Sequence, residues 1–309
     1  MLESDTVVAF TGDTDRAPRV VDTARSLVDA KRGGRVVVGS ALRPLSPAAH
    51  ALLVPYAGLG DDYDAVRAEL AELATERLTA RVSGTDVHVA WGEPADALAE
   101  ICGRVGPAMV VVDRTEDASA ARPGEVAPST TAVLRRSSVP VFVAGTTSGE
   151  TGGTILFATD LAPAAMIALQ WLLPFAVRGD RKIVPLHVVP DVSAWDHANV
   201  IGGKKRDGVG GRVAKEAKRL FAQIRDGLTL DFPVDVQLDD RLADLELEAG
   251  DPGAEIVAKA EAVGADLVVV MRSQALTDSG QRFGRVAEYV VRQTSLPVLV
   301  LPPPTPEVE

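Results

Sequence analysis

Residues 267–272 (LVVVMR) form a short apolar run that ends in an arginine, and residues 109–114 (MVVVDR) repeat this pattern. A short valine-rich run of this kind indicates a β-strand that is buried on both faces. Three further pairs of segments recur in the same order around the two runs: residues 7–12 and 154–160, 92–95 and 250–253, and 135–143 and 292–300. Because corresponding positions such as Pro94 and Pro252 are separated by the length of a whole domain, we predict two homologous domains.

The segments between the apolar runs have the spacing of amphipathic helices. Strands that alternate with helices predict an α/β fold of two tandem, doubly wound parallel sheets, each covered by helices on both faces. Asp160 is expected to cap the helix that follows the first strand of the second half, with Pro163 in its first turn. The expected strands are residues 7–10, 35–39, 86–90, 109–112, 141–144, 155–159, 182–189, 234–238, 267–271 and 297–301.

The chain length and the positions of linker-type residues suggest where the domains begin and end. A chain of 309 residues is long enough for two domains of this size. Gly, Thr and Ser are concentrated between the two halves, as is typical of a linker. We therefore expect a first domain at residues 1–146, a linker at 147–153, a second domain at 154–303 and a tail at 304–309.

Charge and hydropathy exclude several classes of protein. The formal net charge of −11 disfavours binding to nucleic acid. The short basic segment at residues 203–206 is interpreted as a solvated loop, with a phosphate site as the alternative. The first residues are acidic, unlike a signal peptide, and the apolar segment 165–177 is interrupted by Gln170 and Pro174. We therefore expect a cytoplasmic protein without membrane insertion.

Several segments of the second half resemble the universal stress protein family. They are residues 155–163 (ILFATDLAP), 186–190 (LHVVP), 250–252 (GDP), 264–270 (GADLVVV) and 286–300. The first half resembles the family more weakly, through the repeated landmarks. The resemblance implies a five-stranded sheet of order 3-2-1-4-5, like that of the adenine-nucleotide α-hydrolases. It also implies a role in regulating the stress response rather than in catalysis, and pairing of domains through the last strand.

Members of the family that bind ATP imply a candidate site in the second half. They carry an aspartate after the first strand, and Asp160 fills that position. After the fourth strand they carry two glycines and then a glycine followed by a hydroxyl residue, because glycines let backbone amides approach phosphates. Here these four positions hold Arg272, Ala275, Gly284 and Arg285, so three of them depart from the pattern. The arginines either replace the amide contacts by charge or fill the former pocket. The candidate nucleotide-binding residues are Asp160, Val189, Arg272, Ser273, Gly284 and Arg285.

The first half has departed further from the same pattern. Gly12 stands at the aspartate position, and residues 114–117 (RTED) replace the glycine-rich segment. Pro128 stands at the final hydroxyl position and has no amide to offer a phosphate. The first-domain site is therefore predicted to be lost, and ATP remains a candidate cofactor for the second domain alone.

Other chemistry-bearing residues have ordinary structural interpretations. His187 is expected to be packed and hydrogen-bonded, and the remaining histidines do not have metal-ligand spacing. Cys102 is interpreted as a core residue, with a reactive thiol as the alternative. Trp195 either covers the core or contacts a partner. The acidic stretch, formed by Asp239, Asp240, Asp244, Glu246 and Glu248, is interpreted as a solvated edge rather than as a pair of catalytic carboxylates.

Two functions follow from these observations. The first is a stress-response regulatory or scaffolding protein with degenerate nucleotide sites and an unidentified protein partner. The alternative is an ATP-binding protein that uses its second domain, with weak ATP hydrolysis left open. An enzyme and a metal site are not expected, since the sequence contains no nucleophile–base pair. Residues 141–144 and 298–301 are expected to pair within the chain, and association into a homodimer is left open.

Overall fold

The structure is a computed structural model that describes residues 6–12, 15–28, 34–44, 63–114, 126–146, 153–189, 209–228, 238–272 and 284–303. The chain divides into two compact units, which meet in the sequence between Ala144 and Gly145. These units are called the first and the second domain below, and each is described by itself.

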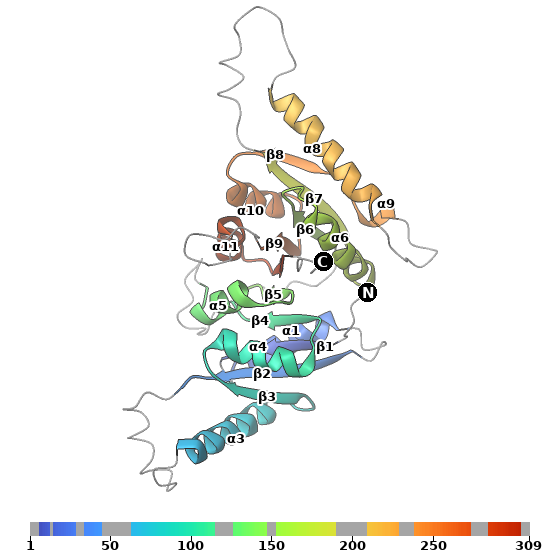
Figure 1. The fold of residues 1–309 in the computed structure, drawn as a ribbon. Helices are drawn as coiled ribbons and strands as arrows, with labels where there is room; N and C mark the ends of the chain where they lie inside the picture. Colours follow the sequence, from blue (N-terminus) through green and yellow to red (C-terminus); the bar gives the residue numbers. More distant parts are fainter. Residues whose placement is uncertain are drawn as a thin grey trace, which may run out of the picture. The chain divides into compact units, whose positions relative to one another are not determined.

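The first domain is a five-stranded parallel sheet of order β3-β2-β1-β4-β5. Helix α1 packs beside α3, and α4 packs beside α5, so helices cover the sheet on both sides (Figure 1). The elements are β1 (Thr6–Phe10), α1 (Ala17–Leu27), β2 (Arg35–Leu42), α3 (Tyr63–Arg81), β3 (Asp86–Trp91), α4 (Pro94–Val105), β4 (Met109–Val112), α5 (Pro128–Arg136) and β5 (Val141–Val143).

The second domain repeats this architecture with the parallel order β8-β7-β6-β9-β10. In chain order within the domain this is 3-2-1-4-5, as expected. The elements are β6 (Thr154–Ala158), α6 (Ala164–Arg178), β7 (Lys182–Val189), α8 (Val209–Asp226), α9 (Leu238–Arg241), β8 (Glu246–Ala249), α10 (Pro252–Ala262), β9 (Leu267–Met271), α11 (Arg285–Gln293) and β10 (Val298–Leu301).

The valine-rich runs form the centre of each sheet because they have no polar side chain to expose. Val110 and Val111 in β4, and Val268 and Val269 in β9, are completely buried. The register repeats as well, since Val7 pairs with Met109 and Ile155 pairs with Leu267. The expectation of two copies of one doubly wound fold is confirmed.

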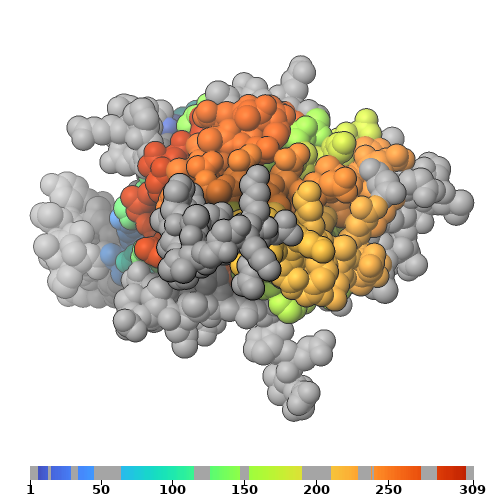
Figure 2. Space-filling model, turned by 90° about the horizontal axis from the view of Figure 1, so that it is seen from above, coloured from blue at the N-terminus to red at the C-terminus, as the bar shows by residue number. Residues whose placement is uncertain are grey.

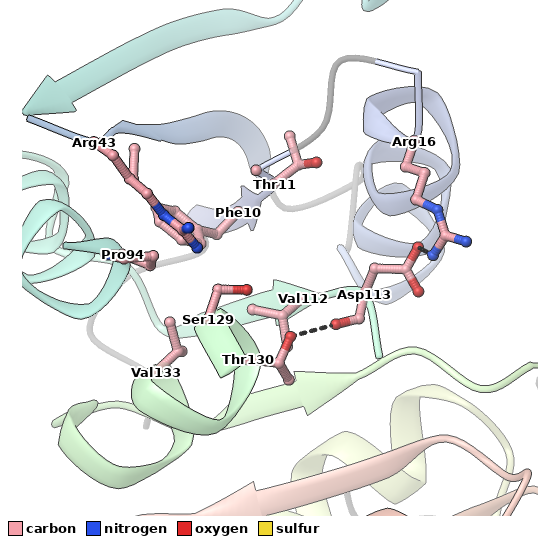
Figure 3. Close-up of a pocket in the computed structure, with 12 residues that line it drawn as sticks. Phe10, Thr11, Arg16, Arg43, Pro94, Val112, Asp113, Ser129, Thr130 and Val133 are labelled. Atoms are coloured by element: carbon pink, nitrogen blue, oxygen red, sulfur yellow. Dashed lines mark hydrogen bonds and ion pairs between the residues drawn. The ribbon is translucent and has the colours of Figure 1, made fainter. Parts of the chain in front are cut away.

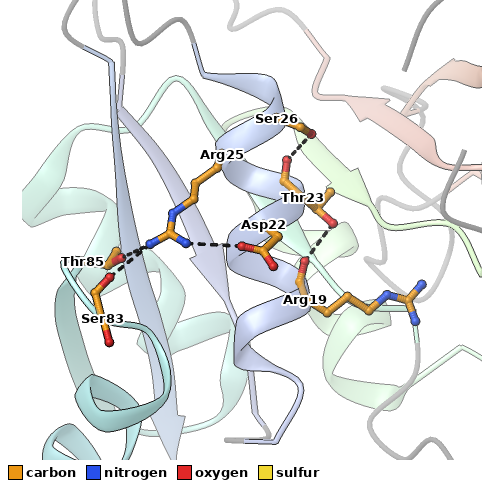
Figure 4. Close-up of polar contacts among 7 residues, drawn as sticks. All are labelled: Arg19, Asp22, Thr23, Arg25, Ser26, Ser83 and Thr85. Atoms are coloured by element: carbon orange, nitrogen blue, oxygen red, sulfur yellow. Dashed lines mark hydrogen bonds and ion pairs between the residues drawn. The ribbon is translucent and has the colours of Figure 1, made fainter. Parts of the chain in front are cut away.

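Polar contacts fix the end of α1 against the turn between α3 and β3 (Figure 4). The guanidinium of Arg25 donates to the carbonyl of Ser83 at 3.2 Å and to the hydroxyl of Thr85 at 3.1 Å. It also contacts Asp22, one turn earlier on the helix, at 3.3 Å. These contacts are exposed, and each stabilises the fold by about 1 kcal/mol.

The predicted third strand of the second domain is wrong. Residues 234–237 lie outside the described part of the chain, Leu238 begins α9, and the third strand is β8 at Glu246–Ala249. Glu246 and Glu248 therefore belong to an edge strand rather than to a solvated connection. Lys259 of α10 makes this possible, because its Nζ lies 3.3 Å from the Glu246 carboxylate and 3.0 Å from that of Glu248. Charged side chains are common on edge strands, where they oppose pairing with other chains.

Among the described residues, no helix has both the length and the apolar character that crossing a membrane requires.

Candidate functional site

A cavity of about 840 Å³ lies at the carboxyl ends of β6, β7 and β9 in the second domain. Ligands of doubly wound folds bind at this end of the sheet. Asp160, Arg272, Gly284 and Arg285 all line the cavity, so four of the predicted site residues lie around one space. Val189 is not among its lining residues, although the neighbouring Val188 is. Ser273 lies outside the described residues.

The turn after β6 brings Asp160 to the mouth of the cavity. The hydroxyl of Thr159 accepts the N–H of Leu161 at 3.0 Å, and Oδ1 of Asp160 accepts the N–H of Ala162 at 3.0 Å. Leu161 has a φ of 61°, which is rare for a residue with a branched side chain. The expected role of Asp160 as the helix cap is wrong, because α6 begins at Ala164 with Pro163 as its N-cap. Asp160 stabilises the turn instead, and its side chain lines the cavity.

Arg272 follows β9 and is 8% exposed. Its backbone N–H donates to the carbonyl of Leu301 at 2.9 Å, so this amide belongs to the sheet. The phosphate contact that the family pattern places at this position is therefore not available from the backbone. The side chain lines the cavity instead, and a guanidinium there attracts an anion through charge and directed N–H groups.

Helix α11 begins at the same cavity. Gly284 is its N-cap, Arg285 is its first residue, and both line the space. The first N–H groups of a helix have no partner within the helix, and the helix dipole makes this end favourable for anions. Arg285 is exposed and adds a full positive charge at the same end. The β9–α11 side of the cavity is therefore suited to phosphate.

The remaining wall is apolar. Met166 and Ile167 of α6, Ile256 of α10 and Val286 of α11 line it. Ile167 and Val286 are 48% and 38% exposed, so apolar side chains are accessible at the rim. A pocket with an apolar wall and a few convergent polar groups is typical of a small-molecule site.

His187 lies at the β7 side of the cavity. As predicted, its ring is hydrogen-bonded: Nδ1 lies 2.8 Å from the carbonyl of Thr159. Because a carbonyl only accepts, Nδ1 donates a proton to this hydrogen bond. The half-buried ring also lines the cavity, a role that the sequence interpretation did not give it.

The first domain has a smaller cavity of about 300 Å³ at the equivalent end of its sheet (Figure 3). An ion pair stands in it: Nη1 of Arg16 lies 2.9 Å from Oδ2 of Asp113, and the two side chains are 13% and 11% exposed. The hydroxyl of Thr130 donates to the carbonyl of Asp113 at 2.8 Å. Pro128 is the first residue of α5, and no side chain caps that helix. The arrangement offers a carboxylate where the second domain offers Met271.

Sequence reasoning missed the Arg16–Asp113 pair, and it did not predict that the arginine after each fourth strand is buried. Arg114 is 4% exposed and corresponds to Arg272. Burial lowers the pKa of Arg114 to about 10, and the neighbouring Asp113 opposes this shift in part. The shared arginine at the end of residues 109–114 and 267–272 was the available signal.

The other candidates carry no chemistry in the described residues. No group of histidine, cysteine and carboxylate side chains suited to a metal occurs among them. Cys102 is half-buried, and burial raises the pKa of its thiol to about 11, which disfavours the reactive interpretation. His50, Trp195 and residues 203–206 lie outside the described ranges.

The sequence profile of the universal stress protein family matches residues 4–145 and again residues 153–302. The chain belongs to the universal stress protein family. Two crystal structures with the same fold cover nearly the whole chain. One is a proposed universal stress protein of Pseudomonas aeruginosa UCBPP-PA14, with a TM-score of 0.63 and 15% identity over 98% of this chain and 94% of that chain. The other is a universal stress protein of Archaeoglobus fulgidus DSM 4304, with a TM-score of 0.60 and 16% identity over 97% and 99%. No curated protein matches the sequence.

As a tandem universal stress protein, the chain carries a cavity at the carboxyl end of each sheet, and the two cavities differ in chemistry. The second-domain cavity joins arginines, a helix N-terminus and a carboxylate around a larger, mainly apolar space. The first-domain cavity is smaller, and an internal ion pair stands in it.

Proposed function

We propose that this tandem universal stress protein is a regulatory protein that binds an adenine nucleotide in its second domain. The observation that carries the proposal is the convergence of Asp160, Arg272, Gly284 and Arg285 around one cavity. The cavity volume of about 840 Å³ is within the range of about 300–1,000 Å³ that is usual for small-molecule sites.

The residues that line the second-domain cavity fit the successive parts of a nucleotide in order along the carboxyl edge of the sheet. Arg272, Arg285 and the start of α11 form a positive end for the phosphates. Asp160 accepts hydrogen bonds from the adenosine hydroxyl or amino groups, and the apolar wall receives the adenine ring. The departures from the family pattern replace neutral amide contacts by charged ones, which are roughly twice as strong. The nucleotide is then held mainly by side chains.

A regulatory role fits this site better than a catalytic one. Among the described residues there is no cluster of side chains suited to a metal. The hydroxyl of Thr159, which lies beside Asp160 and His187, accepts the N–H of Leu161 and so belongs to the turn. A ligand that binds only the folded second domain stabilises it by RT ln(1 + [L]/Kd). Binding is therefore a means of changing the stability and surface of this domain in response to nucleotide concentration.

Calorimetric titration of the full chain with ATP and AMP tests the proposal. We expect binding in the micromolar range and an affinity about 10-fold lower in Asp160→Asn and in Arg285→Ala, since each loses one charged contact. The matched control is Arg43→Ala, which removes an exposed arginine from the first-domain cavity and is expected to change nothing.

Two results would contradict the proposal. Absence of binding would favour a scaffolding protein with two degenerate sites, which the three departures in the phosphate loop already suggest. An effect of Arg43→Ala as large as that of Arg285→Ala would place the ligand in the first domain.

A further inference from the structure

A second, apolar groove adjoins the nucleotide cavity in the second domain. It has a volume of about 430 Å³ and lies between α8 and the ends of β6 and β7. Its apolar lining consists of Leu161, Val213, Ala217 and Leu220. Asp160 and His187 line both the groove and the cavity, so the two spaces meet at these side chains.

The groove exists because the apolar stripe of α8 extends beyond the core. Val213, Ala217, Leu220 and Ile224 follow helical spacing and share one face of the helix. Phe221 and Ile224 are only 5% and 8% exposed, whereas Val213 and Leu220, which lie nearer the helix start, are half-buried. The small side chain of Ala217 lies between them and leaves space. Figure 2 shows α8 (amber) at the molecular surface. Arg212 and Glu216 of this helix are exposed.

The strand order sets the direction in which a ligand would run. Strands β7, β6 and β9 are neighbours in that order, and adjacent strands lie about 4.8 Å apart. Arg272 stands at the end of β9, Asp160 at the end of β6, and His187 on β7. The groove is therefore on the far side of Asp160 from the arginines. A group that fills it extends from the adenosine end of a nucleotide, not from its phosphates.

The chemistry of the groove selects an aliphatic group. All four apolar lining side chains are aliphatic, and its polar groups are at the junction, Asp160 and His187, and at the exposed face, Arg212 and Glu216. A second nucleobase would leave its ring nitrogens and exocyclic groups without partners against the aliphatic wall. A hydrocarbon chain has no such cost and gains from each methylene removed from water.

We propose that the second domain recognises adenine nucleotides that carry an alkyl or acyl chain on the adenosine moiety, with the chain lying in the α8 groove. This inference rests on the proposed nucleotide site. The probe is N6-hexyl-AMP, compared with AMP, in calorimetric titrations of the full chain. Since each buried methylene raises affinity about 4-fold, we expect N6-hexyl-AMP to bind at least about 10-fold more tightly than AMP.

Two variants test whether the hydrocarbon chain of the probe lies in the groove. Ala217→Leu fills the space and is expected to abolish the preference for N6-hexyl-AMP while leaving the affinity for AMP unchanged. Ala222→Leu makes the same change on the exposed face of α8 and is expected to keep the preference. If Ala217→Leu lowers the melting temperature, Val213→Asp, which changes a half-buried wall residue, replaces it in the comparison.

The outcomes separate this inference from the nucleotide site itself. Equal binding of AMP and N6-hexyl-AMP overturns the aliphatic groove and leaves the nucleotide site standing. Tighter binding of N6-hexyl-AMP that persists in Ala217→Leu and in Val213→Asp also overturns the aliphatic groove, because the hexyl group then lies elsewhere. Binding of neither probe overturns both proposals.

Discussion

Arg16 and Asp113 form an ion pair of 2.9 Å across 97 positions of the sequence, and it stands in the cavity of the first domain. Asp113 directly follows β4, and Arg16 immediately precedes α1. The equivalent position to Asp113 in the second domain is Met271, which carries no charge. One copy of the fold therefore places an internal ion pair in its cavity, whereas Arg272 and Arg285 line the cavity of the other copy.

Breaking this pair is expected to destabilise the first domain. Arg16→Met leaves the carboxylate of Asp113 in a nearly buried position without its partner. We expect the free energy of unfolding to fall by about 2–4 kcal/mol, as for other buried pairs that lose one member. The double variant Arg16→Met/Asp113→Leu is expected to recover only part of the loss, because the buried guanidinium of Arg114 then lacks the favourable charge of Asp113. Urea denaturation of the two variants measures both values, and an unchanged stability in Arg16→Met would contradict the assignment.

The raised pKa of Cys102 predicts slow thiol chemistry and a defined pH dependence. Burial raises the pKa from 9.0 to about 11, so the folded chain holds the neutral thiol at pH 8. We expect the reaction with a disulfide reagent at pH 8 to be slower in the native protein than in urea by about 100-fold. The neutral thiol favours the folded state, so its contribution to stability is complete below pH 9 and is lost between about pH 9 and 11. Equal reaction rates in the two states would show that the thiol is accessible.

Two glycines in helices are expected to respond in opposite directions to replacement by alanine. A Cβ at Gly253 would stand 2.6 Å from Cδ1 of Tyr289, so Gly253→Ala must displace the ring by which α11 packs against α10. A Cβ at Gly211 in α8 would meet nothing within 4 Å. We expect Gly253→Ala to destabilise the second domain by about 1–3 kcal/mol and Gly211→Ala to stabilise it by about 0.5–1 kcal/mol. Thermal unfolding measures both, and stabilisation by both would contradict the contact with Tyr289.

Pairing of residues 141–144 with residues 298–301 stays a prediction from the sequence. Insertion of a protease site between Gly149 and Glu150, in the predicted linker, tests it. After cleavage we expect the two halves to co-elute on size exclusion at micromolar concentration. The reason is that pairing of the two edge segments would satisfy their exposed backbone N–H and C=O groups. Separate elution of two folded halves would show that the linker alone holds them together.

Most of the fold could be predicted from the sequence, because the runs at residues 109–112 and 267–271 have the short, valine-rich pattern of strands that are buried on both faces. The resemblance to the family also grouped Asp160, Arg272, Gly284 and Arg285 as one candidate site, and all four line one cavity. Prediction from the sequence failed at the third strand of the second domain, where Glu246 and Glu248 concealed a strand. Their charges are tolerated because they are partly exposed on an edge strand and because Lys259, from a helix that follows, lies against both.

The repeat, the alternation of strands and helices, and the family follow from the sequence by itself, because hydrophobic periodicity and turn residues act over short stretches of chain. The difference between the two ligand positions does not. The pairing of Arg16 with Asp113, the commitment of the Arg272 amide to Leu301 and the junction of two spaces at His187 each join residues that are distant in the sequence. Only the packed structure decides such contacts, since they depend on which side chains the sheet brings within hydrogen-bonding distance.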